Sequence, residues 1–184
     1  MALGAFGALG VARRAPMNRF LRILKHRWLD EDDVRRALGA GTLERLQARV
    51  AASEKTHSGE IRVCVEAGLP LSYLWRDASA RQRAVTMFGK LRVWDTEYNN
   101  GVLIYLLLAE RRVEIVADRG LNRWLSHAQW QDIANRMGSA FREGHFEEGL
   151  NAAVDAVDRA LRARFALAPG ERNPNELPDA PDLR

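Results

Sequence analysis

Residues 96–121 read TEYNNGVLIYLLLAERRVEIVADRGL and contain the most hydrophobic run of the chain. The run at 102–109 is apolar at consecutive positions, which is typical of a central strand covered on both faces. A short charged turn follows it, and residues 113–117 return as the hairpin partner. An Asn-Asn-Gly triplet and an Asp-Arg-Gly triplet bracket the pair. The stretch therefore predicts an antiparallel hairpin in the middle of a sheet.

The segments around this hairpin predict one α/β domain. Residues 61–66, IRVCVE, alternate between apolar and other side chains and indicate a strand with one well-buried face. A helix expected from Ser72 to Lys90 joins this strand to the hairpin, and such a crossover implies parallel pairing with a right-handed connection. Helical apolar spacing recurs before residue 58 and after residue 126. The expected fold is a mixed sheet, with a parallel crossover and an antiparallel hairpin, and helices on both faces.

The chain divides into four predicted parts. Residues 1–16 are expected to form a disordered extension, since their positive charges follow the apolar segment, the wrong order for a secretion signal. Residues 17–41 form a basic, amphipathic helical leader, and residues 42–165 form the α/β domain. Residues 166–184 are expected to be a disordered tail, because they hold four of the six prolines and few apolar side chains.

The positive charge of the chain is concentrated near its N-terminus. Residues 1–29 carry six cationic side chains and no acid, whereas the other residues sum to a net charge of −2. Within residues 17–29, apolar side chains fall on one helical face with cations at the flanks. Such a helix docks onto an anionic membrane surface or a protein partner, or packs its apolar face onto its own domain. The near-neutral charge of the residues after 29, together with the lack of interleaved aromatic residues, argues against nucleic acid as a partner.

The single cysteine, Cys64, excludes an internal disulfide and a cysteine-based metal cage. Its place in a strand favours a small core residue. Nothing in the cysteine content indicates an oxidising compartment, so a cytoplasmic location is expected, peripheral to the membrane if the leader docks there.

The usual catalytic motifs are missing from the sequence, which contains no phosphate-binding glycine loop, no G-x-S-x-G and no His-Glu-x-x-His. The remaining candidate site is the rim of the sheet, where Asp95 and Asn100 precede the central strand and Asp118 follows the hairpin. Carboxylate and amide oxygens are ligands for Ca²⁺ or Mg²⁺. The alternative is ordinary turn structure, because Asn and Asp bond to neighbouring backbone groups in tight turns.

The pattern as a whole resembles the TPM-domain family, named after thylakoid lumen, photosystem II repair and receptor-modulator proteins. The resemblance covers residues 42–165, and the leader MNRFLRILKHRWLDE is similar to that of a soluble bacterial branch without a transmembrane helix. The resemblance rests on the segments SGEIRVCVE (58–66) and NNGVLIYLLLAERRVEIVADRGL (99–121), and on the positions Trp130, Phe141, Gly144, Phe146, Gly149, Leu150, Ala153 and Val154.

This resemblance implies a mixed sheet flanked by helices and leaves two functions open. Some relatives are described as metal-dependent acid phosphatases, and others act through membrane or receptor association. Asn100, Gly101 and Asp118 occupy characteristic positions of the family, but Asn122 stands where many relatives have glutamate. The first hypothesis is a non-enzymatic interaction module that docks through residues 17–29. The alternative is a weak divalent-metal-dependent phosphatase, with Ca²⁺ or Mg²⁺ bound by Asp118, Asp95 and Asn100.

Overall fold

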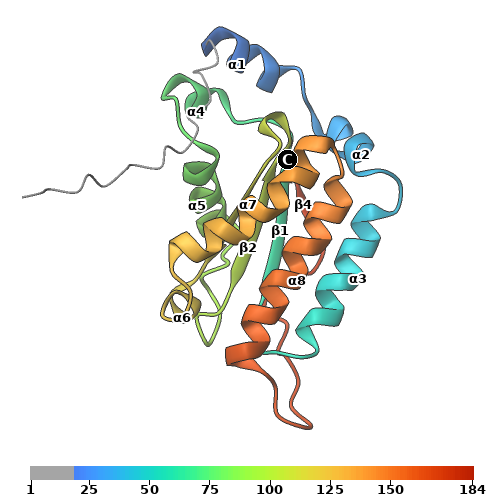
Figure 1. Ribbon diagram of the computed structural model, residues 1–184, viewed down its shortest axis with the longest axis vertical. Coiled ribbons are helices and arrows are strands. Elements are labelled where there is room, and N and C mark those ends of the chain that lie inside the picture. The colour runs from blue at the N-terminus through green and yellow to red at the C-terminus, as the bar shows by residue number, and fades with distance from the viewer. Residues whose placement is uncertain (1–18) are drawn as a thin grey trace, which may run out of the picture.

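The computed structural model describes residues 19–184, apart from the side chains of Asn122, His127 and Arg136. The extension predicted for residues 1–16 lies outside the described residues. The elements run in the order α1 Arg19–Arg27, α2 Glu31–Leu38, α3 Thr42–Glu54, β1 Ile61–Glu66, α4 Leu71–Trp75, α5 Ala80–Lys90, β2 Val102–Leu107, η1 Leu108–Glu110, β3 Arg112–Ala117, α6 Arg119–Asn122, α7 His127–Glu143, α8 Phe146–Phe165 and β4 Asp182–Leu183 (Figure 1).

The sheet is mixed, as predicted, with the strand order β3-β2-β1-β4. β1 pairs in parallel with β2, and Ile61 lies opposite Val102. β2 pairs in antiparallel with β3, and Val102 lies opposite Ala117. All six residues of β2 are buried, which confirms the prediction of a central strand covered on both faces.

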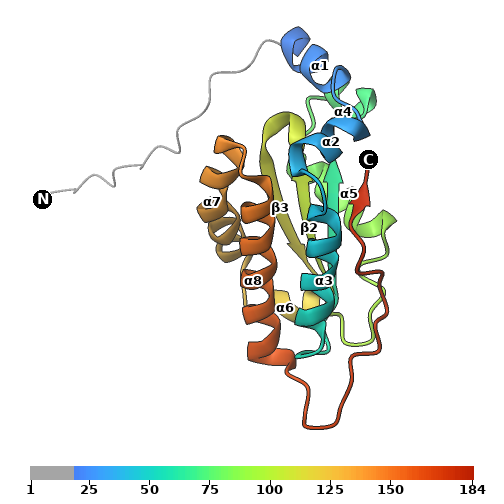
Figure 2. The ribbon, with the colours of Figure 1, turned by 90° about the vertical axis from the view of Figure 1, so that its right-hand side faces the viewer.

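Two apolar cores lie on the two faces of the sheet. The larger core packs alternate strand residues such as Val63 and Ile104 against α2, α3, α7 and α8. The smaller core packs the other set, including Leu103 and Tyr105, against α4 and α5. The sheet consequently lies between α7 and α8 on one side and α5 on the other (Figure 2), which confirms the predicted helices on both faces. The prediction that residues 61–66 have only one well-buried face is wrong, because all six residues of β1 are buried between these two layers.

The C-terminal segment differs from the predicted disordered tail. β4 adds a parallel strand to the edge of β1, and Cys64 lies opposite Asp182. Asn173 donates hydrogen bonds from Nδ2 to the carbonyl oxygens of His57 and Gly59, at 3.0 and 3.1 Å. Leu177 is buried in the smaller core. The free edge of β1 explains the difference, because its unpaired backbone groups bind the tail even though the tail has few apolar residues.

The helix predicted from Ser72 to Lys90 is broken into α4 and α5. Asp77 adopts a positive φ of 50° between them. Ser79 then starts α5 with a capping box, in which its side chain accepts from the Gln82 amide and Gln82 bonds back to the Ser79 backbone. The capping box satisfies donors that would be orphaned at a new helix start, so it stabilises the break.

Candidate functional site

The predicted rim residues lie in the loops at one end of β2 and β3. Asn100 is buried and donates from Nδ2 to the carbonyl oxygen of Ser58 at 3.0 Å. Asp118 is the N-cap of α6, where Oδ1 accepts from the Arg119 amide at 2.7 Å. Asp95 lies in the exposed loop before Thr96. The Asp118 bond is local and typical of a turn, whereas the Asn100 side chain ties its turn to the segment before β1, 42 residues away.

Two glycines allow the bracketing turns to pack tightly. A Cβ atom on Gly101 would lie 1.9 Å from the carbonyl oxygen of Val93, and one on Gly120 would lie 2.4 Å from that of Asn99. The Asp118 amide donates to the Gly101 carbonyl at 2.9 Å, and the Gly120 amide donates to the Asn99 carbonyl at 2.9 Å. The two glycines are thus explained by close backbone contact, without a ligand.

The rim nevertheless contains two unsatisfied acceptors. Oδ1 of Asn100 and Oδ2 of Asp118 are buried and have no hydrogen-bond partner among residues 19–184. Such atoms are costly unless a donor or a cation reaches them. Across residues 19–184, however, no group of three or more His, Cys, Asp or Glu side chains is arranged to hold a metal ion. The described residues therefore offer two buried oxygens at this edge, and the assignment of a metal to Asp95, Asn100 and Asp118 stays a prediction.

At the opposite end of β2, α1 is fixed to the domain through its polar side chains. Arg22 binds Oε1 of Glu110 through Nε at 3.0 Å and Nη2 at 2.8 Å, and it also reaches Asp77. His26 is buried, and its Nδ1 accepts from the Leu69 amide at 2.9 Å. Its Nε2 therefore carries the proton that it donates to Glu110 at 3.2 Å. Polar contacts, rather than an apolar stripe, thus dominate the inner face of α1.

Glu110 is the common partner of these bonds. Burial opposes its charge, but the hydrogen bonds from His26 and Arg22 outweigh the burial and lower the pKa of Glu110 to about 2. The carboxylate is therefore ionised throughout the neutral range. It binds α1 to the turn between β2 and β3.

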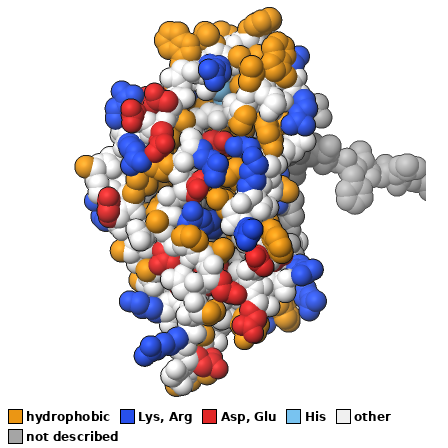
Figure 3. All heavy atoms as spheres, turned by 180° about the vertical axis from the view of Figure 1, so that it is seen from behind, with side chains coloured by type: hydrophobic (Ala, Val, Ile, Leu, Met, Phe, Trp, Pro, Cys, Tyr) orange, Lys and Arg blue, Asp and Glu red, His pale blue; other side chains and the backbone are white. Residues whose placement is uncertain are grey.

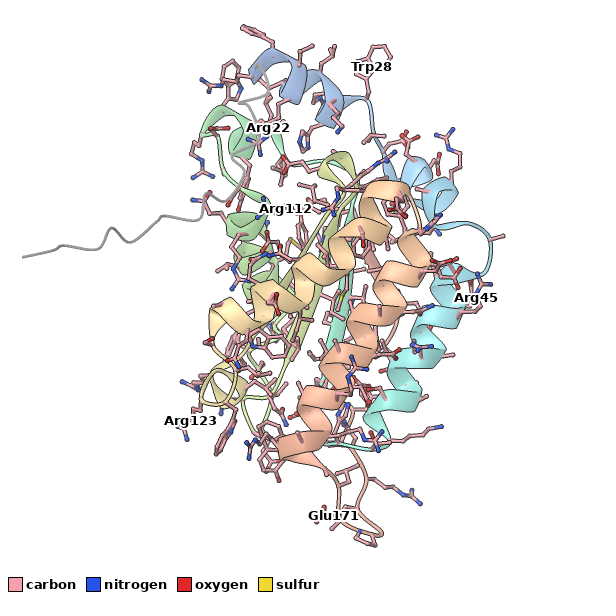
Figure 4. All side chains as sticks on the ribbon, in the orientation of Figure 1. Arg22, Trp28, Arg45, Arg112, Arg123 and Glu171 are labelled. Atoms are coloured by element: carbon pink, nitrogen blue, oxygen red, sulfur yellow. The ribbon has the colours of Figure 1, made fainter. Side chains whose placement is uncertain are left out.

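The large apolar side chains of α1, and that of Trp28 directly after it, point away from the domain. Phe20 and Trp28 are each 78% exposed, and Leu21 and Leu24 are 59% and 53% exposed. Figure 4 shows Arg22 directed toward the domain and Trp28 directed away from it. Only Ile23 of this helix packs, in part, against the smaller core. The alternative in which the apolar face packs onto its own domain is therefore wrong for these four residues.

The exposed face of α1 borders an open groove. The groove has a volume of about 890 Å³ and lies between α1, α2, η1 and the start of α8. Leu24 and Trp28 form one apolar wall, and Phe146 forms part of the other. Basic side chains also line it, namely Lys25, Arg111 and Arg142. Seen from behind, the molecule carries hydrophobic side chains at the α1 end with cationic side chains beside them (Figure 3).

A Ser-His-Asp contact occurs elsewhere but lacks the order of a catalytic triad. Ser53 Oγ lies 2.9 Å from His57 Nε2 and donates to Asp158 Oδ1 at 2.8 Å. His57 Nδ1 lies 3.0 Å from the carbonyl oxygen of Gly59. The serine thus stands between the histidine and the aspartate, and its proton is given to the acid. In a triad the histidine occupies the middle position, so this group is a structural tie between α3 and α8.

A second buried polar group lies under α5. Arg83 binds both oxygens of Glu66, with Nη2 to Oε1 at 2.6 Å and Nε to Oε2 at 2.9 Å. Tyr105 donates to Glu66 Oε2 at 2.5 Å. Burial, followed by the adjacent carboxylate, raises the pKa of Tyr105. The three side chains satisfy one another and are almost inaccessible, so they support the fold rather than a reaction.

Within the described part of the chain, no helix has both the length and the apolarity needed to cross a bilayer. Comparison with curated proteins gave no match. The chain is similar to the BA42 protein of the psychrophilic bacterium Bizionia argentinensis, with 27% identity and a TM-score of 0.67 over 79% of this chain and 94% of that one. It is also similar to the N-terminal domain of a P. gingivalis protein, with 25% identity and a TM-score of 0.57 over 70% and 78% of the two chains.

The model of the TPM domain matches residues 32–160. The match includes both bracketing turns and the whole β2–β3 hairpin, and it begins after α1. Because it spans more than half of the sequence, the chain belongs to the TPM-domain family.

Proposed function

We propose that the chain is a non-enzymatic interaction module that docks onto an anionic membrane surface through α1 and the adjoining Trp28. The main support for the proposal is the orientation of α1. Its polar residues Arg22 and His26 bind the domain, whereas Phe20, Leu24 and Trp28 face solvent. A contiguous exposed apolar patch of this kind marks an interaction surface. The helix is thus already held in the orientation that docking requires.

Charge at the same helix favours an anionic surface over a neutral one. Lys25 and Arg27 are exposed, and within residues 19–184 neither of them pairs with a carboxylate. Each such cation contributes about 1 kcal/mol beside an anionic leaflet. Each large apolar side chain that leaves water contributes roughly 1.5–3 kcal/mol when fully buried. Tryptophan also favours the membrane–water interface, where Trp28 would lie.

Flotation of the full chain with vesicles of phosphatidylglycerol tests the proposal. The triple variant Phe20→Ser, Leu24→Ser, Trp28→Ser is expected to bind at least tenfold more weakly than wild type, because three exposed apolar anchors are lost. Its thermal unfolding is expected to stay close to wild type, since none of these side chains is buried. Wild type is expected to prefer phosphatidylglycerol to phosphatidylcholine.

A matched control distinguishes binding through α1 from non-specific binding through other exposed aromatic side chains. Trp94 and Trp124 are 51% and 55% exposed and lie outside α1. The double variant Trp94→Ser, Trp124→Ser is expected to float like wild type. Absence of binding by wild type, or equal binding by wild type and the α1 variant, contradicts the proposal.

A weak divalent-metal-dependent phosphatase is the second candidate. It is favoured by the two buried oxygens without partners, Asn100 Oδ1 and Asp118 Oδ2. These atoms would be an amide and a carboxylate ligand, and Asp95 would join them from its loop. An ion bound there supplies Lewis-acid activation of water or of a phosphate ester.

Asp118→Asn tests this candidate while keeping an N-cap side chain. At a hundredfold excess over its dissociation constant, Ca²⁺ or Mg²⁺ is expected to raise the melting temperature of wild type by about 5 °C or more. The variant is expected to lose most of that shift, together with any chelator-sensitive hydrolysis of a phosphomonoester. The exposed residue Glu44 supplies the control Glu44→Gln. A wild type that shows no thermal shift and only chelator-insensitive hydrolysis eliminates the site.

A further inference from the structure

The groove beside α1 combines an apolar interior with basic side chains. Leu108 and Ala109 at its base are almost completely buried, and Leu24, Trp28 and Phe146 add apolar wall. Its volume of about 890 Å³ is within the usual range for small-molecule pockets, roughly 300–1,000 Å³. The groove is thus large enough for a ligand with its own apolar part.

The two acids that line the groove are already engaged. Glu110 is bound by Arg22 and His26. Asp33 binds Arg36 at 2.7 Å through Oδ1, and its other oxygen accepts from the Asp30 amide. These carboxylates therefore add little free negative charge to the groove.

The basic residues of the groove, by contrast, have no acidic partner in the part of the chain that the structure describes. Within residues 19–184, none of Lys25, Arg111 and Arg142 pairs with a carboxylate. Arg111 follows η1 with a φ of 48° and donates from Nη1 to the Arg142 carbonyl oxygen at 2.6 Å. This bond fixes one guanidinium group beside the groove. Arginine suits a phosphate ester well, because its planar donors bind two oxygens at once.

We propose that this groove binds the head group of one anionic phospholipid. Lys25, Arg111 and Arg142 hold the phosphate, and an acyl chain lies along Leu24 and Trp28. This inference rests on the membrane docking proposed above and specifies the lipid chemistry that the docked surface selects. The charge of the groove and its apolar floor together fit an anionic amphiphile better than a free phosphate.

The position of the groove supports the same occupant. Leu24 and Trp28 belong both to the exposed apolar surface at α1 and to the groove wall. A lipid held there would keep its tail on the face that contacts the membrane. The binding site and the docking surface are therefore continuous.

Titration of the full chain with monomeric dihexanoyl phosphatidylglycerol tests the inference. Wild type is expected to bind it saturably with one site, and at least tenfold more tightly than inorganic phosphate or dihexanoyl phosphatidylcholine. The double variant Arg111→Gln, Arg142→Gln is expected to bind the lipid at least tenfold more weakly, because it removes two of the cations that hold the phosphate.

The control is the double variant Arg92→Gln, Arg123→Gln, which removes the same charge from exposed positions outside the groove. Arg92 also has a positive φ, 55°, so it matches the backbone of Arg111. The control is expected to bind like wild type. Equal loss in both double variants, or inorganic phosphate bound as tightly as the lipid, overturns the inference.

One outcome separates this inference from the proposed function. If wild type floats with phosphatidylglycerol vesicles but shows no saturable lipid binding, the head-group site is wrong and docking through α1 stands. If wild type does not float at all, the proposed membrane docking is wrong, and the inference that rests on it is wrong as well.

Discussion

Replacing Arg83 by methionine is expected to lower the free energy of unfolding by about 3–5 kcal/mol. The side chains of Arg83 and Glu66 are only 6% and 4% exposed, and they form a bidentate pair under α5. Methionine fills much of the same space but cannot pair with the carboxylate. Glu66 is then left with the hydroxyl of Tyr105 as its partner, and a buried charge without a counter-ion is strongly unfavourable. Denaturant unfolding followed by circular dichroism measures the change.

A double variant distinguishes the ion pair from packing. In Glu66→Gln, Arg83→Met the buried charge is gone, while the side-chain oxygen of the introduced glutamine still accepts from Tyr105. At least half of the lost stability is expected to return, because removing both charges costs far less than stranding one of them. If the double variant is as unstable as Arg83→Met alone, the loss comes from packing of the Arg83 side chain and the ion-pair explanation is wrong.

The sequence predicts best those features that local patterns determine. The β2–β3 hairpin follows from a continuous apolar run and a short turn, and the mixed sheet follows from a strand–helix–strand order. The α2 start at Asp30 follows from an acidic cluster, which proves to be a capping box with Asp33. The hairpin and the helix start are each decided by residues within a few positions of one another, and the sheet follows from the order of elements that such local patterns define.

Features that depend on distant partners are not visible in the sequence. The amphipathic pattern of α1 is correct, but its direction depends on Glu110, which is 88 residues from Arg22 and 84 from His26. A glutamate in a hairpin turn is ordinarily solvated, so nothing singles it out as a buried partner. The tail likewise looks disordered by composition, and only the open edge of β1 gives it a place.

The candidate site residues likewise include some that local patterns place and others that depend on distant segments. Asn100 and Asp118 are the residues of the bracketing turns, and the hairpin itself brings them to one end of the sheet. Asp95 depends on the course of an exposed loop, which no periodic pattern fixes. The basic groove residues come from α1, the turn after η1 and α7, which lie far apart in sequence. No local motif could have assembled the basic set of Lys25, Arg111 and Arg142.

A second large effect is expected where the tail meets α3. Glu54 is 4% exposed, and its Oε1 accepts from the Ile61 amide at 2.8 Å, whereas none of the described residues donates to its Oε2. Burial, together with the nearby carboxylates of Glu60 and Asp179, raises the pKa of Glu54 to about 9, although the Ile61 bond opposes the rise. Glu54 is therefore protonated in the fold at neutral pH, while the unfolded chain has already released this proton.

The sign of the pH dependence follows from that difference. A carboxyl with a raised pKa in the fold contributes most below its unfolded pKa of about 4.5, and its contribution is lost as the pH rises toward 9. Glu54→Gln retains the acceptor for Ile61 and cannot ionise. Between pH 5 and pH 9, the free energy of unfolding of wild type is therefore expected to fall by on the order of 2–4 kcal/mol relative to the variant. Denaturant unfolding at several pH values measures this difference.

The exposed residue Glu44 on the same helix provides the control, and Glu44→Gln is expected to follow the wild-type pH profile. Parallel profiles for wild type and Glu54→Gln contradict the prediction. Because Asp179 belongs to the tail, ionisation of Glu54 places two negative charges where the tail meets α3. The Arg184 amide, which donates to the Val65 carbonyl at 3.0 Å, reports on β4. Corrected for base catalysis, its hydrogen exchange is expected to accelerate with pH in wild type and to stay constant in Glu54→Gln.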